Sequence, residues 1–236
     1  MCTVTFVKTV DKIVITSNRD EKVIRPNAIP PKNYIVKGKN VIYPKDPKAG
    51  GTWYVVDDNG TILVLLNGAN EKHIVKLPYR KSRGLIVLEM IGSESPRDFW
   101  DEINLDNIEP FTLVLYQNES LFQLRWNGME KETIVMDGNK NHIWSSSTLY
   151  PQSVREKRAN WFYTFLDVTP EISETEMFQF HRYAEEGNQE NGLVINRNQE
   201  MKTVSITQSI FEKNKVIIMH HDLVAQKDSM TSFIKV

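Results

Sequence analysis

Short runs of β-branched and other apolar residues, separated by turn signals, dominate the first third of the chain. The runs are Thr3–Val7, Ile13–Ser17, Tyr34–Val36, Val41–Tyr43, Trp53–Val56 and Ile62–Leu66. The last two flank Asn59-Gly60, a dipeptide that is typical of a tight hairpin turn. This part of the sequence therefore predicts a series of β-hairpins.

The apolar positions then change to helical spacing. The predicted helices cover Ser82–Ile91, Pro96–Asn104, Pro151–Val168 and Glu171–Glu186. The first is so short and so apolar that a buried strand would also fit it. The third carries an apolar stripe at spacings of three and four, in which Arg158 is the one polar member.

Strand patterns resume between and after the helices. They cover Phe111–Gln117, Leu121–Trp126, Glu132–Met136, Ile143–Ser145, Met201–Thr207 and Val216–His220. We find no repeat, low-complexity linker or change in composition. Hairpins interrupted by pairs of helices predict a single α+β domain over residues 1–236, with two antiparallel sheets and helical layers.

Composition narrows the function classes. The chain has 236 residues, a net charge of -1 and a single cysteine, which excludes an intrachain disulfide and a multi-thiolate zinc site. The balanced charge gives no reason to expect a nucleic-acid partner. None of the five histidines shows metal-ligand spacing, so no metal site is predicted. Without a signal sequence or a run of transmembrane length, we expect a cytoplasmic protein that is not stably inserted into membranes.

The single cysteine is Cys2, directly after the initiator Met1. Met1 is readily removed before a small side chain, which would leave Cys2 with a free α-amino group. That amine titrates near ~7.7–8.0 and can accept the thiol proton at neutral pH. One residue would then supply both nucleophile and base. The alternative is that position 2 simply holds a small residue.

A hairpin that turns at Val10-Asp11 would pair residues whose numbers add to about 21 and place Cys2 opposite Arg19. A slip of one residue would place Asn18 or Asp20 there instead. In each register, the polar run from Asn18 to Glu21 arrives beside Cys2. Arg19 could then stabilise a thiolate, and Asp20 could hold the α-ammonium group. The alternative is an ordinary polar strand end with surface ion pairs.

A second cluster comprises Gly50-Gly51 before Trp53, and Asn67 after the strand Ile62–Leu66. The glycines permit close backbone approach. Asn67 at a strand end can offer a hydrogen-bond donor to a developing oxyanion.

Taken together, these segments resemble the family named for its Asn-Arg-Asp-Glu motif, which is related to transport and Golgi organisation protein 2. The matching segments are Met1–Phe6, Ser17–Glu21, Arg25-Pro26, Gly50–Trp53, Gly60 and Leu65–Asn67, with weaker similarity in Ser145–Tyr150 and Met201–Thr207. The resemblance implies an N-terminal-nucleophile hydrolase-like fold, a four-layer αββα sandwich with two stacked antiparallel sheets. It also implies kinship with penicillin V acylase and bile-salt hydrolase enzymes, which cleave non-peptide amide bonds.

By this resemblance, Cys2 matches the nucleophile, Arg19 and Asp20 match its supporting pair, and Asn67 matches an oxyanion position. Asn18, Trp53 and Ser146 are the predicted substrate-binding residues. Relatives have Ser-Asn where this chain has Ser145-Ser146, so a second asparagine donor is missing. A hydroxyl of Ser146 or Ser147 could replace it. Loss of one such donor can cost ~10²–10³ in rate.

The sequence therefore gives a leading hypothesis and an alternative. The leading one is an amidohydrolase that cleaves a small-molecule amide or ester through a Cys2 thioester after removal of Met1, with no cofactor. The alternative is a non-catalytic binding or trafficking protein that holds haem or a lipid in the same pocket.

Overall fold

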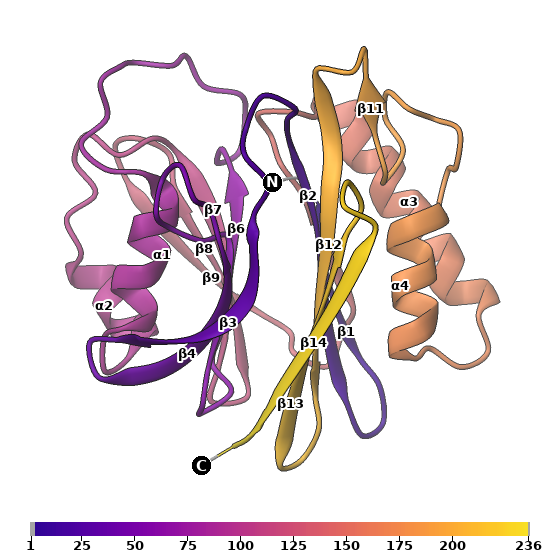
Figure 1. The fold of residues 1–236 in the computed structure, drawn as a ribbon, viewed down its shortest axis with the longest axis horizontal. Coiled ribbons are helices and arrows are strands. Elements are labelled where there is room, and N and C mark those ends of the chain that lie inside the picture. Colours follow the sequence, from indigo (N-terminus) through magenta and orange to yellow (C-terminus); the bar gives the residue numbers. More distant parts are fainter. Residues whose placement is uncertain (1–2, 236) are drawn as a thin grey trace.

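Two seven-stranded antiparallel sheets stack face to face in the computed structural model, which describes residues 3–235 (Figure 1). The first sheet has the order β10-β1-β2-β12-β13-β14, with β11 against β12. Its strands are β1 (Thr3–Lys8), β2 (Ile13–Lys22), β10 (His142–Ser145), β11 (Asn196–Arg197), β12 (Met201–Phe211), β13 (Lys215–Asp222) and β14 (Lys227–Ile234). The hairpin β1–β2 lies in its middle, and this position buries the end of β2.

The second sheet follows the chain from β3 to β9 without a crossover. Its strands are β3 (Ile29–Val36), β4 (Lys39–Lys45), β5 (Tyr54–Asp57), β6 (Ile62–Asn67), β7 (Phe111–Gln117), β8 (Ser120–Trp126) and β9 (Lys131–Met136).

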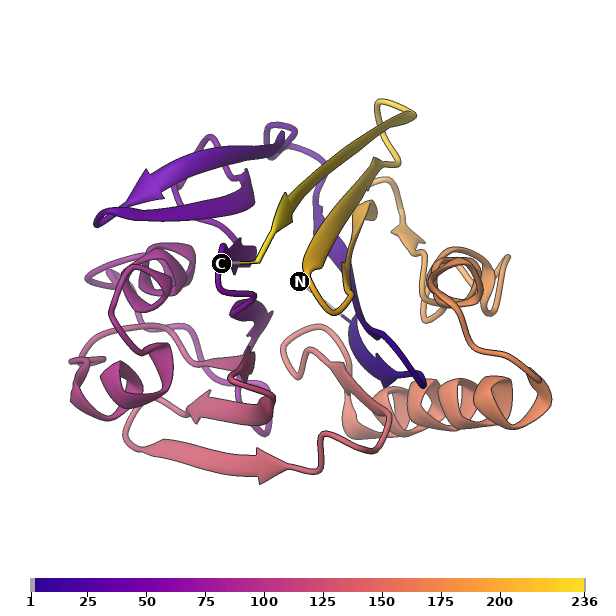
Figure 2. The ribbon, with the colours of Figure 1, turned by 90° about the horizontal axis from the view of Figure 1, so that it is seen from below.

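Helices cover the outer face of each sheet (Figure 2). Helices α1 (Arg83–Ile91) and α2 (Pro96–Glu102) lie on the second sheet, and α3 (Gln152–Val168) and α4 (Glu174–Tyr183) on the first. The layers are thus α, β, β and α, as the resemblance implied. None of the helices within residues 3–235 is long and apolar enough to cross a membrane.

Strand alternation distributes the side chains of the first sheet between two cores. Val4 and Phe6 on β1 pack with Ile15 in the main core between the sheets. Val7 and Val14 belong to a second cluster, formed with apolar residues of α3 and α4. Successive residues of a strand point to opposite faces, so each polar residue of the β1–β2 hairpin is assigned to one of these layers.

The predicted register of the first hairpin is confirmed for the described residues. The pairs run from Thr3 opposite Asn18 to Lys8 opposite Ile13, and the numbers in each pair add up to 21. The predicted contact of Cys2 with Arg19 lies outside the described residues, because Cys2 does.

Several boundaries differ from the expectation. Strand β14 was not predicted, because it is a half-exposed edge strand with a polar sequence and weak apolar alternation. Strand β3 begins at Ile29 and contains Pro30-Pro31, which its edge position tolerates. Helix α4 is shorter than predicted, because Ser173 caps its start. The ambiguous run before Gly92 is a helix.

Candidate active site

The polar run at the end of β2 divides between the two faces of the first sheet. Arg19 points toward the second sheet, where it meets Trp53 and Asp46. Asn18 and Asp20 point toward the helical layer, where they meet His181 and Tyr150. The side chains of Arg19 and Asp20, predicted to act together, therefore project from the end of β2 toward opposite faces of the sheet.

Arg19 is held rigidly although its charge is buried. Its side chain is 3% exposed, and its Nη2 donates to Asp46 Oδ2 at 2.9 Å. Its guanidinium carbon lies 4.0 Å from the centroid of the Trp53 ring, a cation–π contact. Glu21 lies 3.6 Å from the same Nη2. Because a guanidinium stays charged at every relevant pH, this arrangement fixes a permanent positive charge at the end of β2.

Asp46 organises the loop that follows β4. Its Oδ2 accepts from Arg25 Nε at 2.7 Å as well as from Arg19, and its Oδ1 accepts from the amides of Lys48 and Ala49, both at 2.9 Å. Burial opposes ionisation of the carboxyl, but the hydrogen bonds from Arg25 and Ala49 and the charges of Arg25 and Arg19 keep its pKa below the ordinary value. Asp46 therefore remains an anion that positions Arg19.

Asp20 is bound on the other face of β2. Its Oδ2 accepts from the hydroxyl of Tyr150 and its Oδ1 from the hydroxyl of Thr203, each at 2.5 Å. The buried Tyr150 ring contacts two guanidinium groups, with Arg158 at 3.6 Å and Arg197 at 5.0 Å from its centroid. A β-bulge between Thr203 and Ser205 turns Thr203 toward Asp20.

Asn18 anchors β2 to the helical layer. Its Nδ2 donates to the carbonyl oxygens of His181 and Leu193, so its Oδ1 faces Nδ1 of His181 at 2.5 Å and must accept. The imidazole Nε2 lies 2.8 Å from Thr5 Oγ1. Burial, with the nearby charge of Arg158, lowers the pKa of His181 to about 3 and keeps the ring neutral. The described hydrogen bonds of the predicted binding residue Asn18 thus hold α4 and the segment at Leu193 against β2.

Arg158 fixes the start of β1. Its Nη1 donates to Thr3 Oγ1 and its Nη2 to the carbonyl of Gly192, both at 2.5 Å. The side chain is fully buried. Its sequence signal was its position as the one polar residue on the apolar stripe of α3. Asp46 carries no comparable sequence signal, and Tyr150 has only its place in the weakly similar segment Ser145–Tyr150; both residues lie in loops.

Asn67 and Ser146 meet on the other side of β1. Asn67 ends β6, and its backbone carbonyl accepts from the Ser146 hydroxyl at 2.7 Å. This bond uses the one hydroxyl proton of Ser146, so in this arrangement Ser146 has no donor left for an oxyanion. Gly68 permits the close approach: it has a φ of +83°, and a Cβ there would lie 2.3 Å from Ser147 Oγ.

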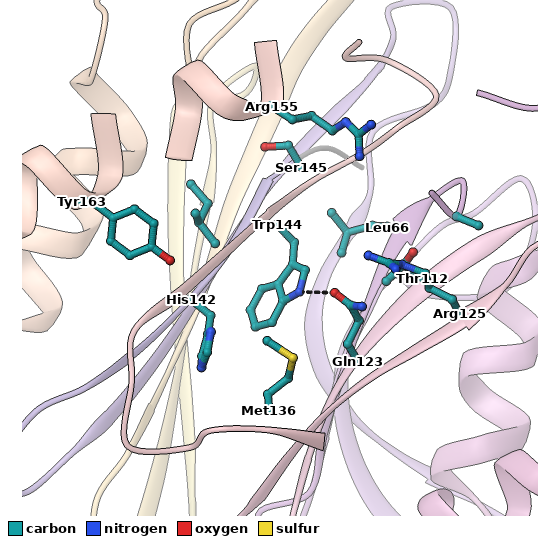
Figure 3. Close-up of a pocket in the computed structure, with 12 residues that line it drawn as sticks. Leu66, Thr112, Gln123, Arg125, Met136, His142, Trp144, Ser145, Arg155 and Tyr163 are labelled. Carbon is teal, nitrogen blue, oxygen red and sulfur yellow. Dashed lines mark hydrogen bonds between the residues drawn. The ribbon is translucent and has the colours of Figure 1, made fainter. Parts of the chain in front are cut away.

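A pocket of about 350 Å³ opens beside these residues (Figure 3). Its lining consists of Leu66, Ala69, Thr112, Gln123, Arg125, Met136, His142, Ile143, Trp144, Ser145, Arg155 and Tyr163. Leu66 and Ser145 directly precede Asn67 and Ser146. Ser145 also pairs with Thr3, and the two hydroxyl oxygens are 3.3 Å apart.

The predicted positions therefore form two groups on either side of the start of β1. Thr3 pairs with Asn18 of β2 on one side, next to Arg19 and Asp20, and with Ser145 of β10 on the other. Trp53 joins the first group through Arg19. The predicted nucleophile Cys2 lies outside the described residues. Within residues 3–235, no group of three or more His, Cys, Asp or Glu side chains is arranged to hold a metal ion.

Solved structures show the same fold at low sequence identity. The Caenorhabditis elegans ortholog of N-acylethanolamine-hydrolyzing acid amidase superposes with a TM-score of 0.61 at 10% identity, over 88% of this chain and 92% of that one. Two variants of the conjugated bile acid hydrolase from Clostridium perfringens give TM-scores of 0.54 and 0.52. They are 9% and 10% identical, over 98% and 99% of this chain and 92% and 96% of theirs. The chain thus has the N-terminal-nucleophile hydrolase fold.

A search of curated proteins finds no significant match. A family model does match, over residues 1–227, and its description is Transport and Golgi organisation 2. The match covers nearly the whole chain and includes the Asn18–Glu21 run and both groups around the start of β1. The chain belongs to the Transport and Golgi organisation 2 family.

Proposed function

We propose that this chain is an N-terminal-cysteine hydrolase that cleaves an amide or ester bond of a small molecule. The observation that carries the proposal is the arrangement around the start of β1, with the buried Arg19 and Asp20 on one side and Asn67 on the other. The fold shared with an amidase and a bile acid hydrolase supports the same reaction class.

The proposed reaction begins with removal of Met1 in the cytosol, which frees the α-amine of Cys2. That amine takes the thiol proton, and the thiolate attacks the substrate carbonyl carbon. The tetrahedral intermediate collapses when the protonated amine returns a proton to the leaving nitrogen or oxygen, so that the amine or alcohol departs and a thioester remains. Water then hydrolyses the thioester to the acid and restores the thiol.

The surrounding residues have distinct tasks in this scheme. Arg19, fixed by Asp46 and Trp53, supplies positive charge that favours the thiolate over the thiol. Asp20 accepts hydrogen bonds from the α-ammonium group and orients it. Asn67 donates to the oxyanion of the tetrahedral intermediate.

A panel of fluorogenic N-acyl amides and aryl esters tests this function. We expect the wild-type protein to turn over at least one acyl chain length, and Cys2→Ala to lose that turnover. Circular dichroism of both proteins controls for folding. Equal turnover by the wild-type and Cys2→Ala proteins would contradict the proposal.

One observation favours a second candidate, a non-catalytic protein that binds haem or a lipid. The Ser146 hydroxyl, which could have replaced the missing asparagine donor, is engaged by the Asn67 carbonyl. A site with one oxyanion donor fewer would still bind a ligand while losing rate. This candidate predicts saturable binding of haem, followed by its Soret band, or of a fatty acid, together with no Cys2-dependent turnover of any substrate in the panel.

A further inference from the structure

Two arginines of the pocket in Figure 3 have buried donors without a partner. The Nε atoms of Arg125 and Arg155 are both inaccessible to solvent and make no hydrogen bond. The lining includes no aspartate or glutamate. A buried donor left unpaired costs ~1–3 kcal/mol, so a ligand acceptor that pairs with these two groups would recover that cost.

Of the two guanidinium groups, that of Arg155 has fewer hydrogen-bond and ion-pair partners within the described part of the chain. It projects from α3, and its Nε has no hydrogen-bond partner among residues 3–235. It also borders two adjoining hollows, one of them beside Ser147 and Tyr150. By contrast, the neighbouring arginine of α3, Arg158, is bound by Thr3 and Gly192.

Arg125 reaches the same pocket from β8. Its Nη1 pairs with Glu132 Oε2 at 3.0 Å, which compensates part of its charge. Figure 3 shows Arg155 and Arg125 along one side of the pocket, with Leu66 drawn between them in this view. Two positive charges therefore face the pocket. The carboxylates that border this region are Glu132, which pairs with Arg125, and Glu71 and Glu156, which line the adjoining hollows beside Arg155.

The remaining wall is apolar and fixed. The indole Nε1 of Trp144 donates to Gln123 Oε1 at 2.7 Å, which holds the ring across the pocket. Met136, Leu66 and Ile143 extend this wall. The pocket thus combines a cationic end with a rigid apolar surface.

We propose that this pocket binds the anionic group of an amphipathic ligand, a carboxylate or a phosphate, with Arg155 and Arg125 as its partners. Guanidinium groups match the geometry of both anions. The pocket adjoins Asn67 and Ser146 through Leu66 and Ser145. Given the proposed function on which this step rests, the substrate is an acyl amide or ester that carries a negative charge near the scissile bond.

Equilibrium binding to the full chain with Cys2→Ala tests this proposal without turnover. The probes are N-octanoylglycine, its neutral analogue N-octanoylglycinamide, and octyl phosphate, measured by calorimetry. We expect the carboxylate to bind at least about tenfold tighter than the amide, because hydrogen bonds to charged groups are the strong ones. Whether N-octanoylglycine or octyl phosphate binds tighter identifies the preferred anion.

Arg155→Gln should weaken binding of the preferred anion about tenfold or more and change binding of N-octanoylglycinamide less than about twofold. Arg155→Lys should restore part of the loss. Lys157→Gln removes one charge from an exposed position of the same helix and should leave every affinity unchanged. Equal affinity for N-octanoylglycine, octyl phosphate and N-octanoylglycinamide, or an Arg155→Gln protein that keeps the anion preference, would overturn the proposal.

A parallel turnover assay of the wild-type protein separates this proposal from the function on which it rests. Hydrolysis of N-octanoylglycinamide and N-octanoylglycine at equal kcat/KM would overturn the anion site and leave the hydrolase intact. Selective, Arg155-dependent anion binding without any hydrolysis would support the site and contradict the hydrolase.

Discussion

Two regions differ in how many of their charged and amide groups have hydrogen-bond partners. One is the end of β2 around Asp46 and Asn18, and the other is the pocket in Figure 3. At the end of β2, each Asp46 oxygen accepts two hydrogen bonds, and Asn18 bonds through both its amide nitrogen and its oxygen. In the pocket, Arg125 and Arg155 each keep a buried nitrogen without a partner. The saturated region, meaning Asp46 and Asn18 with their hydrogen-bond partners, holds Arg19 and α4 in place, although Ser17 Oγ, Trp53 Nε1 and Ser205 Oγ beside it also lack a partner among the described residues. The arginines of the pocket keep donors that a ligand could use.

This contrast predicts that stability depends on the first region and ligand affinity on the second. The largest effect should come from Asp46→Asn, which removes the charge that compensates the buried Arg19. Breaking a buried ion pair typically costs ~3–5 kcal/mol. We expect the free energy of unfolding in urea to fall by about that amount. Asp101→Asn, which breaks an exposed pair with Arg97, is the control and should cost less than ~1 kcal/mol.

A fall in pH should have the next largest effect on stability, through His181 on α4 and His220 on β13. Burial lowers the pKa of His181 to about 3 and that of His220 to about 4, both from 6.5. Below pH 6.5 these two histidines become protonated in the unfolded chain but stay neutral in the folded chain, so the free energy of unfolding decreases as the pH falls toward 4. The loss approaches ~1.4 kcal/mol per pH unit for each histidine. Urea unfolding at pH 7, 6 and 5 should show this slope, and His181→Gln should make it shallower. An unchanged slope in that variant would show that His181 protonates freely in the fold.

The junction between the two regions should respond to a single methyl group. Gly68→Ala adds a Cβ that would clash with Ser147, at a positive φ. Gly187→Ala has the same backbone strain, with a φ of +90°, but no atom within 4 Å of the added Cβ. We expect Gly68→Ala to lower the free energy of unfolding by about 1 kcal/mol or more beyond the loss in the Gly187→Ala control. Equal losses would mean that the loop of Ser147 yields easily.

The smallest change in stability should come from the pocket. Arg155→Gln removes no described hydrogen bond, and it also removes an unpaired buried donor, so we expect it to lower the free energy of unfolding by no more than ~0.5 kcal/mol. The same urea titration as for Asp46→Asn measures this. A loss as large as that of Asp46→Asn would erase the distinction between the two regions.

Local signals predicted much of the fold. The β1–β2 register followed from a short turn, and Ser95-Pro96 marked the start of α2. Edge strands were less visible: β14 and the first half of β3 are half-exposed, and their sequences show little contrast between their faces. Such edge strands form because they pair with a neighbouring strand of the sheet, and a single sequence does not show which strands will be neighbours.

The sequence predicted the parts of the candidate site that lie close together along the chain. It did not predict the contacts between residues from distant segments. Asn18 to Glu21 could be placed beside the start of β1, because the hairpin brings them there. Asp46, Tyr150 and Arg155 come from distant loops and from α3, and nothing in their own neighbourhoods indicates the partners that they meet. The division of Arg19 and Asp20 between opposite faces follows from strand alternation, which the sequence argument left aside.

The proposed function depends on Cys2, freed from Met1, being the nucleophile. Intact mass spectrometry of the protein, made in a cytosolic host and quenched in acid during turnover of p-nitrophenyl octanoate, tests it directly. We predict a species that lacks Met1 and gains one octanoyl group, located on the peptide that begins at Cys2 and absent from Cys2→Ala. Retention of Met1 in protein that hydrolyses the ester, with no acyl group on residue 2, would contradict it.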